Sequence, residues 1–142
     1  MSYATLQTLV DQYSLNEVVL AADRDQDGVA DPDVVERALE HADGIINSRI
    51  GVKYKLPVNP VPTVLIAYAG DIALYRMSLD TGTWTEEKRK RYEDALKWLD
   101  DVAKGKAVLD GQPEPEQKGG DSRIRVAAQP REFTRDKLGG IL

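Results

Sequence analysis

The chain has 142 residues, a net charge of −5 and no cysteine, which is enough length for one domain with its own hydrophobic core. The lack of cysteine excludes disulfides, thiolate nucleophiles and zinc–thiolate sites. The first residues, MSYATLQTL, lack a charged segment followed by an apolar one, so no secretory signal is expected and the cytoplasm is the expected compartment.

The charge is unevenly distributed. Residues 123–142 hold five basic and two acidic side chains, whereas residues 1–122 hold 14 basic and 22 acidic ones and have a net charge of −8. An acidic body argues against binding of a nucleic-acid backbone as the main function. The basic C-terminal segment suits an acidic surface, such as that of a neighbouring copy.

Two short helices are expected near the N-terminus. Thr5 can cap the first, whose apolar residues recur at helical spacing: Leu6, Leu9, Val10 and Tyr13. Ser14 and Glu17 then form a capping-box pattern ahead of an apolar run, which predicts the second helix.

The sharpest local motif is the segment that follows, DRDQDGVAD. Calcium loops place oxygen ligands at alternate positions and glycine at the sixth. Gly28 takes that sixth position, and aspartates take the first, third, fifth and ninth: Asp23, Asp25, Asp27 and Asp31. The twelfth position, normally glutamate, is Val34. Two interpretations stay open: a calcium site, or an aspartate-rich turn in which Asp31 caps the next helix.

A third helix is predicted from Pro32 to Ile50, with Gly51 as the glycine that ends it. Its apolar stripe consists of Val35, Ala38, Leu39, Ala42, Ile46 and Ile50. His41, the single histidine, lies off this stripe and has no second histidine or cysteine nearby in the sequence. It is therefore expected to be a surface residue and not a general base.

The most apolar segment, Thr63–Leu79, predicts a central helix against which the others pack. One row along it is Leu65, Tyr68, Ile72, Tyr75 and Leu79. Its only charges are Asp71 and Arg76, and each is expected to be partly buried with a partner on another helix or subunit. These charges and Gly70 argue against a membrane span.

A proline-rich arm, residues 54–62, precedes this central helix. Its Pro57, Pro60 and Pro62 exclude a helix interior or a central strand. After the central helix, Thr83 and Glu86 form a capping box that predicts a last helix ending near Lys104. Its predicted buried face is Tyr92, Ala95, Leu96, Leu99, Val102 and Ala103. Trp84 and Trp98 are expected to fill the core or a groove.

The predicted fold is mainly α: a small helical bundle with a proline-rich arm and an extended C-terminal tail. Residues 1–109 are expected to form the helical core, and residues 110–142 a linker and C-terminal arm. The linker is hydrophilic up to Ser122, and a short strand is expected at Arg123–Val126. The apolar residues of the arm predict that it becomes ordered on a partner: Ile124, Val126, Phe133, Leu138, Ile141 and Leu142.

In their order, these segments resemble the Mu-like phage protein family of the head–tail connector, or head-completion, type. The resemblance spans nearly the whole chain and rests on MSYATLQTLVDQY, DRDQDGVADPDVVERAL, RIGVKYKLPVNPVP, IAYAGDIALYR, YEDALKWLDDVAKG and REFTRDKLGGI. It implies a structural subunit of a ring at the portal, found in the host cytoplasm during assembly and then in the virion. Its implied partners are further copies of itself, the portal protein and a neck or tail protein, with DNA passing through the lumen without specific binding and no membrane involved.

The resemblance implies no enzyme activity, and the residues themselves offer no phosphate-binding glycine loop or nucleophile elbow. The alternative function is a small calcium-binding interaction module without catalytic activity. The two hypotheses differ in their response to chelation. A connector should keep its fold without metal, whereas a calcium-dependent module should lose the structure of residues 23–35.

Overall fold

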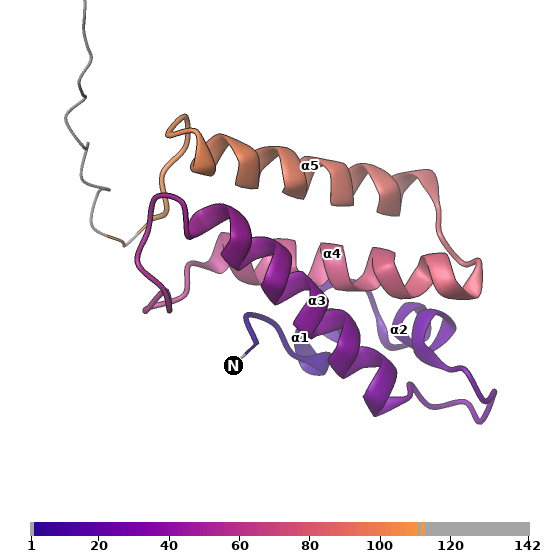
Figure 1. Cartoon of the computed structure of the whole chain (residues 1–142). Helices are drawn as coiled ribbons and strands as arrows, with labels where there is room; N and C mark the ends of the chain where they lie inside the picture. Colours follow the sequence, from indigo (N-terminus) through magenta and orange to yellow (C-terminus); the bar gives the residue numbers. More distant parts are fainter. Residues whose placement is uncertain (1, 111, 113–142) are drawn as a thin grey trace, which may run out of the picture.

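The computed structural model describes residues 2–110 and 112, and within them the chain forms five helices and no strand (Figure 1). The helices are α1 (Leu6–Gln12), α2 (Leu15–Ala22), α3 (Pro32–Ile50), α4 (Thr63–Thr81) and α5 (Glu86–Ala103). The prediction of a mainly α bundle is confirmed. The predicted division at residue 109 stays a prediction, because the linker and arm, including the expected strand, lie almost wholly outside the described residues.

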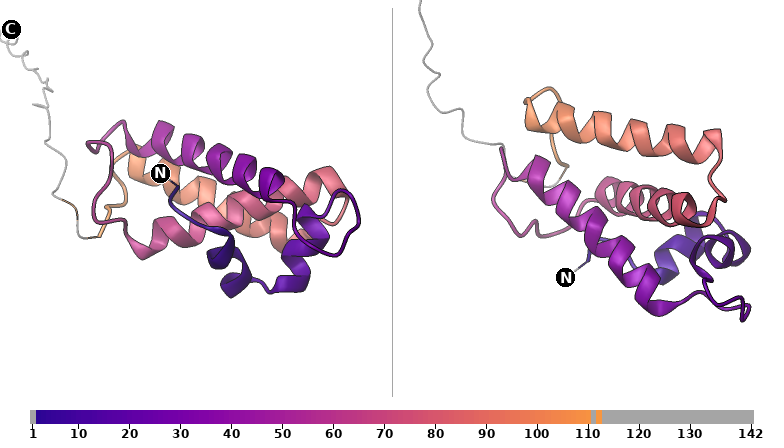
Figure 2. Two further views of the ribbon diagram at one scale, coloured as in Figure 1. Left: turned by 90° about the horizontal axis from the view of Figure 1, so that it is seen from below. Right: turned by 45° about the vertical axis from the view of Figure 1, so that its right-hand side comes forward.

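Helix α4 lies at the centre of the fold and packs against all four other helices (Figures 1 and 2). Its largest fully buried side chains are Leu65, Ile72, Leu74 and Met77. Leu79, expected in the same row, is 48% exposed because it lies near the helix end. No helix in residues 2–110 is both long and apolar enough to cross a membrane.

Helices α3 and α5 contact each other as well as α4, and α1 and α2 contact each other beside it (Figure 2). The whole predicted stripe of α3 is buried, from Val35 to Ile50. On α5, Ala95, Leu99 and Val102 are fully buried, while the rings of Tyr92 and Trp98 pack at its edges. Tyr92 stacks on Tyr75 with 4.7 Å between ring centroids, so aromatic side chains help to join α4 to α5.

The start of α5 differs from the prediction. Its N-cap is Thr85, whose side chain accepts from the backbone N–H of Lys88 at 3.2 Å. Thr83 instead accepts a hydrogen bond from Lys88 Nζ on its carbonyl (3.0 Å). Lys88 is buried there and pairs with Glu17 of α2 at 2.7 Å. These contacts of Lys88 accompany an N-cap that lies two residues after the predicted one. Trp84 therefore lies in the turn before α5 and is 45% exposed, contrary to expectation.

Gly51 follows α3 as predicted, but it does not adopt the left-handed conformation of a typical helix-ending glycine, because its φ is −62°. Glycine is needed here for space: a Cβ would lie 2.7 Å from the Asn47 carbonyl oxygen and 3.2 Å from the Leu56 side chain. A left-handed glycine does end α4: Gly82 has φ +72°.

The proline-rich arm covers one end of the bundle and contains neither helix nor strand, as expected. Tyr54 and Val58 are buried, and the Tyr54 hydroxyl accepts from the backbone N–H of Leu109 at 3.0 Å. Gln112 donates from its side-chain amide to the Pro60 carbonyl at 2.6 Å. The arm thereby holds the residues that follow α5.

Helix α1 approaches α4 closely at Gly70. A Cβ added to Gly70 would lie 1.9 Å from Gln12 Oε1, and the Gln12 amide donates to the Ala67 carbonyl at 3.1 Å. A side chain at residue 70 would displace that amide. The glycine thus permits the close contact between the two helices.

Gly44→Ala and Gly70→Ala should have different effects on the free energy of unfolding. Gly44 lies in an exposed part of α3 with no atom within 4 Å of an added Cβ, so alanine should stabilise by about 1 kcal/mol. At Gly70 the same gain is offset by loss of the Gln12 hydrogen bond, worth about 1 kcal/mol. Urea unfolding should show no net gain for Gly70→Ala, but a gain in a Gln12→Ala background. Equal stabilisation at both glycines would contradict the close contact.

Candidate functional site

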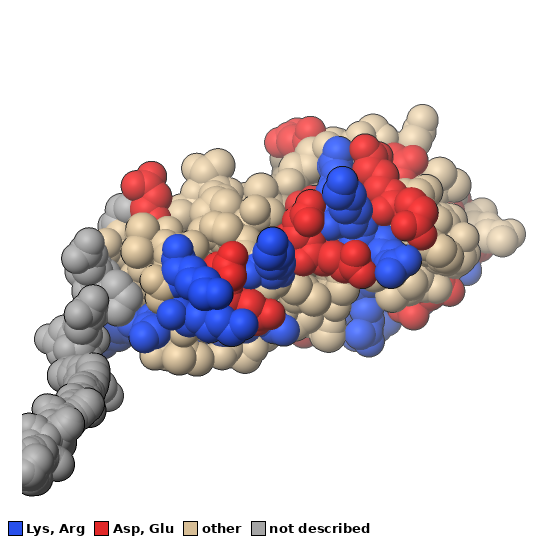
Figure 3. Space-filling view, turned by 90° about the horizontal axis from the view of Figure 1, so that it is seen from above, with Lys and Arg blue, Asp and Glu red and all other residues tan. Residues whose placement is uncertain are grey.

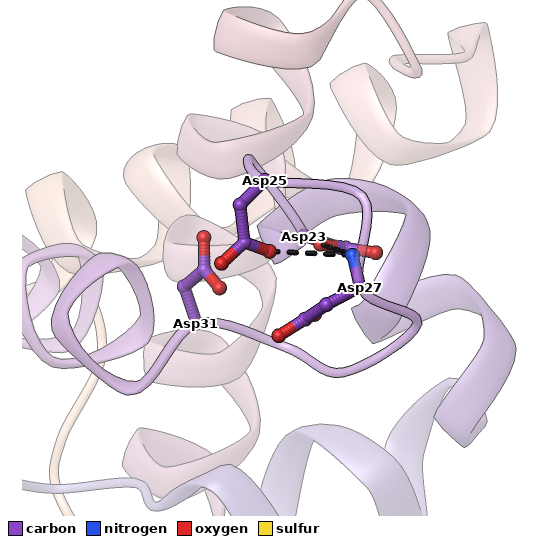
Figure 4. A group of neighbouring side chains, drawn as sticks. All are labelled: Asp23, Asp25, Asp27 and Asp31. Atoms are coloured by element: carbon purple, nitrogen blue, oxygen red, sulfur yellow. Dashed lines mark hydrogen bonds between the residues drawn. The ribbon is translucent and has the colours of Figure 1, made fainter.

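The four predicted ligands come together in the loop between α2 and α3 (Figure 4). Each of Asp23, Asp25, Asp27 and Asp31 offers a carboxylate oxygen, and these four oxygens all lie within 4.8 Å of one another. Asp25 and Asp27 are exposed, while Asp23 and Asp31 are half-buried. The four residues that the spacing singled out therefore form one spatial cluster, and their role as metal ligands stays a prediction.

Backbone N–H groups hold this loop in shape. Gly28 has φ +85°, a conformation that favours glycine, and its N–H donates to Asp23 Oδ2 at 2.8 Å. The N–H of Asp27 donates to Asp23 Oδ1 at 3.2 Å, and the N–H of Val29 donates to Asp27 Oδ1 at 3.0 Å. These bonds turn the chain so that alternate side chains converge.

Asp31 precedes α3 as its N-cap residue, with Pro32 in the first turn, but its side chain makes no capping hydrogen bond. The carboxylate instead accepts from the backbone N–H of Arg24 at 2.9 Å and stays in the cluster. The Arg24 guanidinium reaches Asp80 of α4 at 3.3 Å. The loop is thus tied to the central helix by a side-chain ion pair.

The carboxyl groups influence one another's pKa. Partial desolvation opposes ionisation of Asp23, but hydrogen bonds led by that from Gly28 outweigh it and hold the pKa of Asp23 below its usual range. Desolvation and the neighbouring Asp23 and Asp27 carboxyls raise the pKa of Asp25. This pattern is typical of like charges held close together, and a bound cation would relieve their repulsion.

The geometry suits a hard cation such as calcium. Calcium–oxygen bonds are about 2.3–2.6 Å long, so two ligands on opposite sides of one ion lie up to roughly 5 Å apart. The spread of 4.8 Å fits this limit. The position of the usual closing glutamate is taken by Val34, which is buried against the core and offers no oxygen side chain. Water would have to complete the coordination shell.

His41 is exposed, as predicted, and its Nε2 lies 3.5 Å from an Arg76 guanidinium nitrogen. Partial burial and the Arg76 charge lower the pKa of His41. Arg76 was expected to be partly buried, and this is wrong: it is exposed beside His41 of α3. Its partner on another helix is a histidine and not a carboxylate.

Asp71 is half-buried and finds a partner on another helix, as predicted: the Tyr13 hydroxyl of α1 donates to its carboxylate. The Arg91 guanidinium of α5 lies over the Tyr13 ring, 5.2 Å from its centroid. Burial raises the pKa of Asp71, and burial together with Asp71 raises the pKa of Tyr13 well above its usual range. This cluster joins three helices and has a structural role.

Tyr13→Phe should lower the free energy of unfolding by about 1–3 kcal/mol at neutral pH, since Asp71 loses its donor. The phenol has a higher pKa in the folded chain than its ordinary 10.0, so its contribution is complete below pH 10 and is lost as the pH rises through the folded pKa. The difference between wild type and variant should therefore shrink above pH 10. Denaturant titrations across this pH range test it, with Tyr75→Phe as control. A constant difference at every pH would contradict the assignment.

Comparison with known proteins gives a consistent result. Residues 3–128 match the family described as Bacteriophage Mu, Gp36. The Mu-like prophage FluMu protein gp36 of Haemophilus influenzae is 34% identical over 75% of this chain and 74% of that protein. Gene product J of Escherichia phage Mu is 28% identical over 99% of this chain and its own full length. The chain therefore belongs to the Bacteriophage Mu Gp36 family of Mu-like phage and prophage proteins.

Proposed function

We propose that this chain is a structural subunit of a Mu-like phage or prophage particle, which forms a head–tail connector or head-completion ring at the portal. The observation that carries the proposal is family membership: the match to a phage Mu gene product extends over 99% of the chain. A resemblance over the entire length supports a shared role better than a shared local motif would.

The surface supports an assembly role. Figure 3 shows acidic and basic side chains interleaved along the α5 side of the molecule. Several are already paired within the helix, such as Arg89 with both Glu86 and Glu93, and Arg91 with Glu87. Such a face resists non-specific association of free subunits and leaves ordered assembly to other surfaces.

The proposed partners are further copies of this chain, the portal protein and a neck or tail protein. The acidic body would line a passage for DNA without holding it, because like charges make no counterion-releasing contacts with the phosphate backbone. The subunit would be made in the host cytoplasm and end in the virion. We propose no enzymatic step and no membrane contact.

The decisive test is the protein content of particles. In a prophage or phage that carries this gene, mass spectrometry of purified particles should find the chain in multiple copies. Deletion of the gene should leave DNA-filled heads that do not join tails. Complementation with the intact gene is the control and should restore joined particles. Absence of the chain from purified wild-type particles would exclude a virion subunit.

A second candidate is a calcium-binding interaction module, favoured by the convergence of the four carboxylates. The two functions are compatible, since a metal could stabilise the loop of a connector subunit. Removal of calcium by a chelator distinguishes the two functions. If the fold depends on calcium, removal of the metal should abolish hydrogen-exchange protection in residues 23–35, whereas a connector body would keep it.

Asp25→Asn combined with Asp27→Asn should abolish calcium binding, because both residues supply carboxylate oxygens to the cluster. Native mass spectrometry should show one calcium per wild-type chain and none in the double variant. Asp33→Asn with Asp94→Asn removes equal charge from exposed positions outside the cluster and should leave binding unchanged. A wild-type chain that binds no calcium would leave the loop as an aspartate-rich turn.

A further inference from the structure

The two ends of the helical body carry opposite charge. At one end lie the aspartate loop and the turn between α4 and α5; at the other lie the proline-rich arm and the residues after α5 (Figures 1 and 2). We define the acidic end as residues 20–33 and 79–87, and the basic end as residues 49–56 and 104–109. The acidic end holds eight acidic side chains and one basic, whereas the basic end holds five basic and no acidic side chain.

Ion pairs within the subunit leave most of this charge free. At the acidic end, Arg24 pairs with Asp80, Arg89 with Glu86 and Arg91 with Glu87. Five of the eight carboxylates of this end form no ion pair within residues 2–110: Asp23, Asp25, Asp27, Asp31 and Asp33. At the basic end, Arg49 pairs with Asp100 at 2.8 Å. The other four cations of that end are exposed and form no ion pair within residues 2–110: Lys53, Lys55, Lys104 and Lys106.

Both ends also expose apolar side chains. At the acidic end these are Leu20, Val29, Leu79 and Trp84, which are 45–61% exposed. Leu20 lines a hollow of about 370 Å³ that lies between α2, the loop and Thr81. At the basic end they are Val52, Leu56 and Val108, which are 38–66% exposed. Each end thus combines exposed apolar side chains with charges of one sign, and both contribute to surfaces that bind another protein.

We propose that the acidic end of one subunit docks on the basic end of the next, so that the partner of each end is a second copy of this chain. Charge complementarity selects this occupant: two acidic or two basic ends would repel. The contact joins two different surfaces, and repeated head-to-tail contacts of this kind close into a ring when the rotation between subunits permits. The inference rests on the proposed connector function and identifies the surfaces that would meet in its ring.

Sedimentation velocity over a concentration series of the full chain tests the proposal. The wild type should self-associate. Its association should be weaker in 0.3 M than in 0.02 M salt, because salt screens the attraction between exposed charges. Lys53→Glu with Lys106→Glu lowers the charge of the basic end from +5 to +1, and Asp33→Lys with Glu87→Lys changes that of the acidic end from −7 to −3. Each double variant alone should associate at least about tenfold more weakly, because the attraction between the two ends is then weaker.

A mixture of these two double variants should associate again, since the unchanged acidic end of one variant meets the unchanged basic end of the other. The matched controls are Lys90→Glu with Lys97→Glu, and Glu40→Lys with Asp94→Lys, which change the net charge equally at exposed positions outside the residues that define the two ends. They should keep wild-type association. Circular dichroism of every variant confirms that the helices persist.

Three results would overturn the end-to-end contact: a wild type that stays monomeric at low salt, controls that lose association as fully as the end variants, or no recovery in the mixture. A fourth result would identify a different partner for the acidic end. If Lys53→Glu with Lys106→Glu keeps association and Arg123→Glu with Arg125→Glu loses it, the acidic end binds the basic C-terminal segment instead. The particle experiment is independent of all these outcomes. A chain found in particles without this contact keeps the proposed function and loses only this inference.

Discussion

The fold depends on covering α4. This helix is apolar on nearly all sides, and burying each large aliphatic side chain contributes about 1.5–3 kcal/mol, so exposure of any face would be costly. Four other helices supply that cover. Helices as short as α1 and α2 are marginal by themselves and gain most of their stability from this packing. The close approach at Gly70 and the Tyr13–Asp71 hydrogen bond show how tightly α1 is held to α4.

The same packing brings the carboxylates of the aspartate loop together. The aspartate loop starts at the end of α2 and finishes at the start of α3, and both helices are fixed on α4. The loop between these helices holds one oxygen of each carboxylate within 4.8 Å of the others. Backbone N–H groups and Arg24 offset part of the cost. Both proposed occupants of this loop, a metal ion and the basic end of a neighbour, would relieve the remaining repulsion.

Features encoded by neighbouring residues could be predicted from the sequence, and features encoded by distant ones could not. The bounds of α3 follow from local spacing and were predicted correctly. The same kind of spacing singled out the four aspartates that lie together in the loop, and their role as metal ligands stays a prediction. Thr83 and Thr85 are both reasonable caps for α5, and the choice depends on Lys88 pairing with Glu17 from α2. The exposure of Trp84 follows from that choice. The pairing of Tyr13 with Asp71 joins residues 58 positions apart, so no local pattern could identify it.

The hydrogen bond from the Leu109 backbone N–H to the Tyr54 hydroxyl affects how the C-terminal segments of several copies could act together. The chain beyond α5 leaves each body from one fixed place, beside the arm. In a cyclic assembly, all copies would then start their C-terminal segments from equivalent points on one circle. A partner that engages one segment would meet the rest at high effective concentration, so individually weak contacts would add up to durable attachment. Avidity of this origin requires no strong binding site on any single subunit.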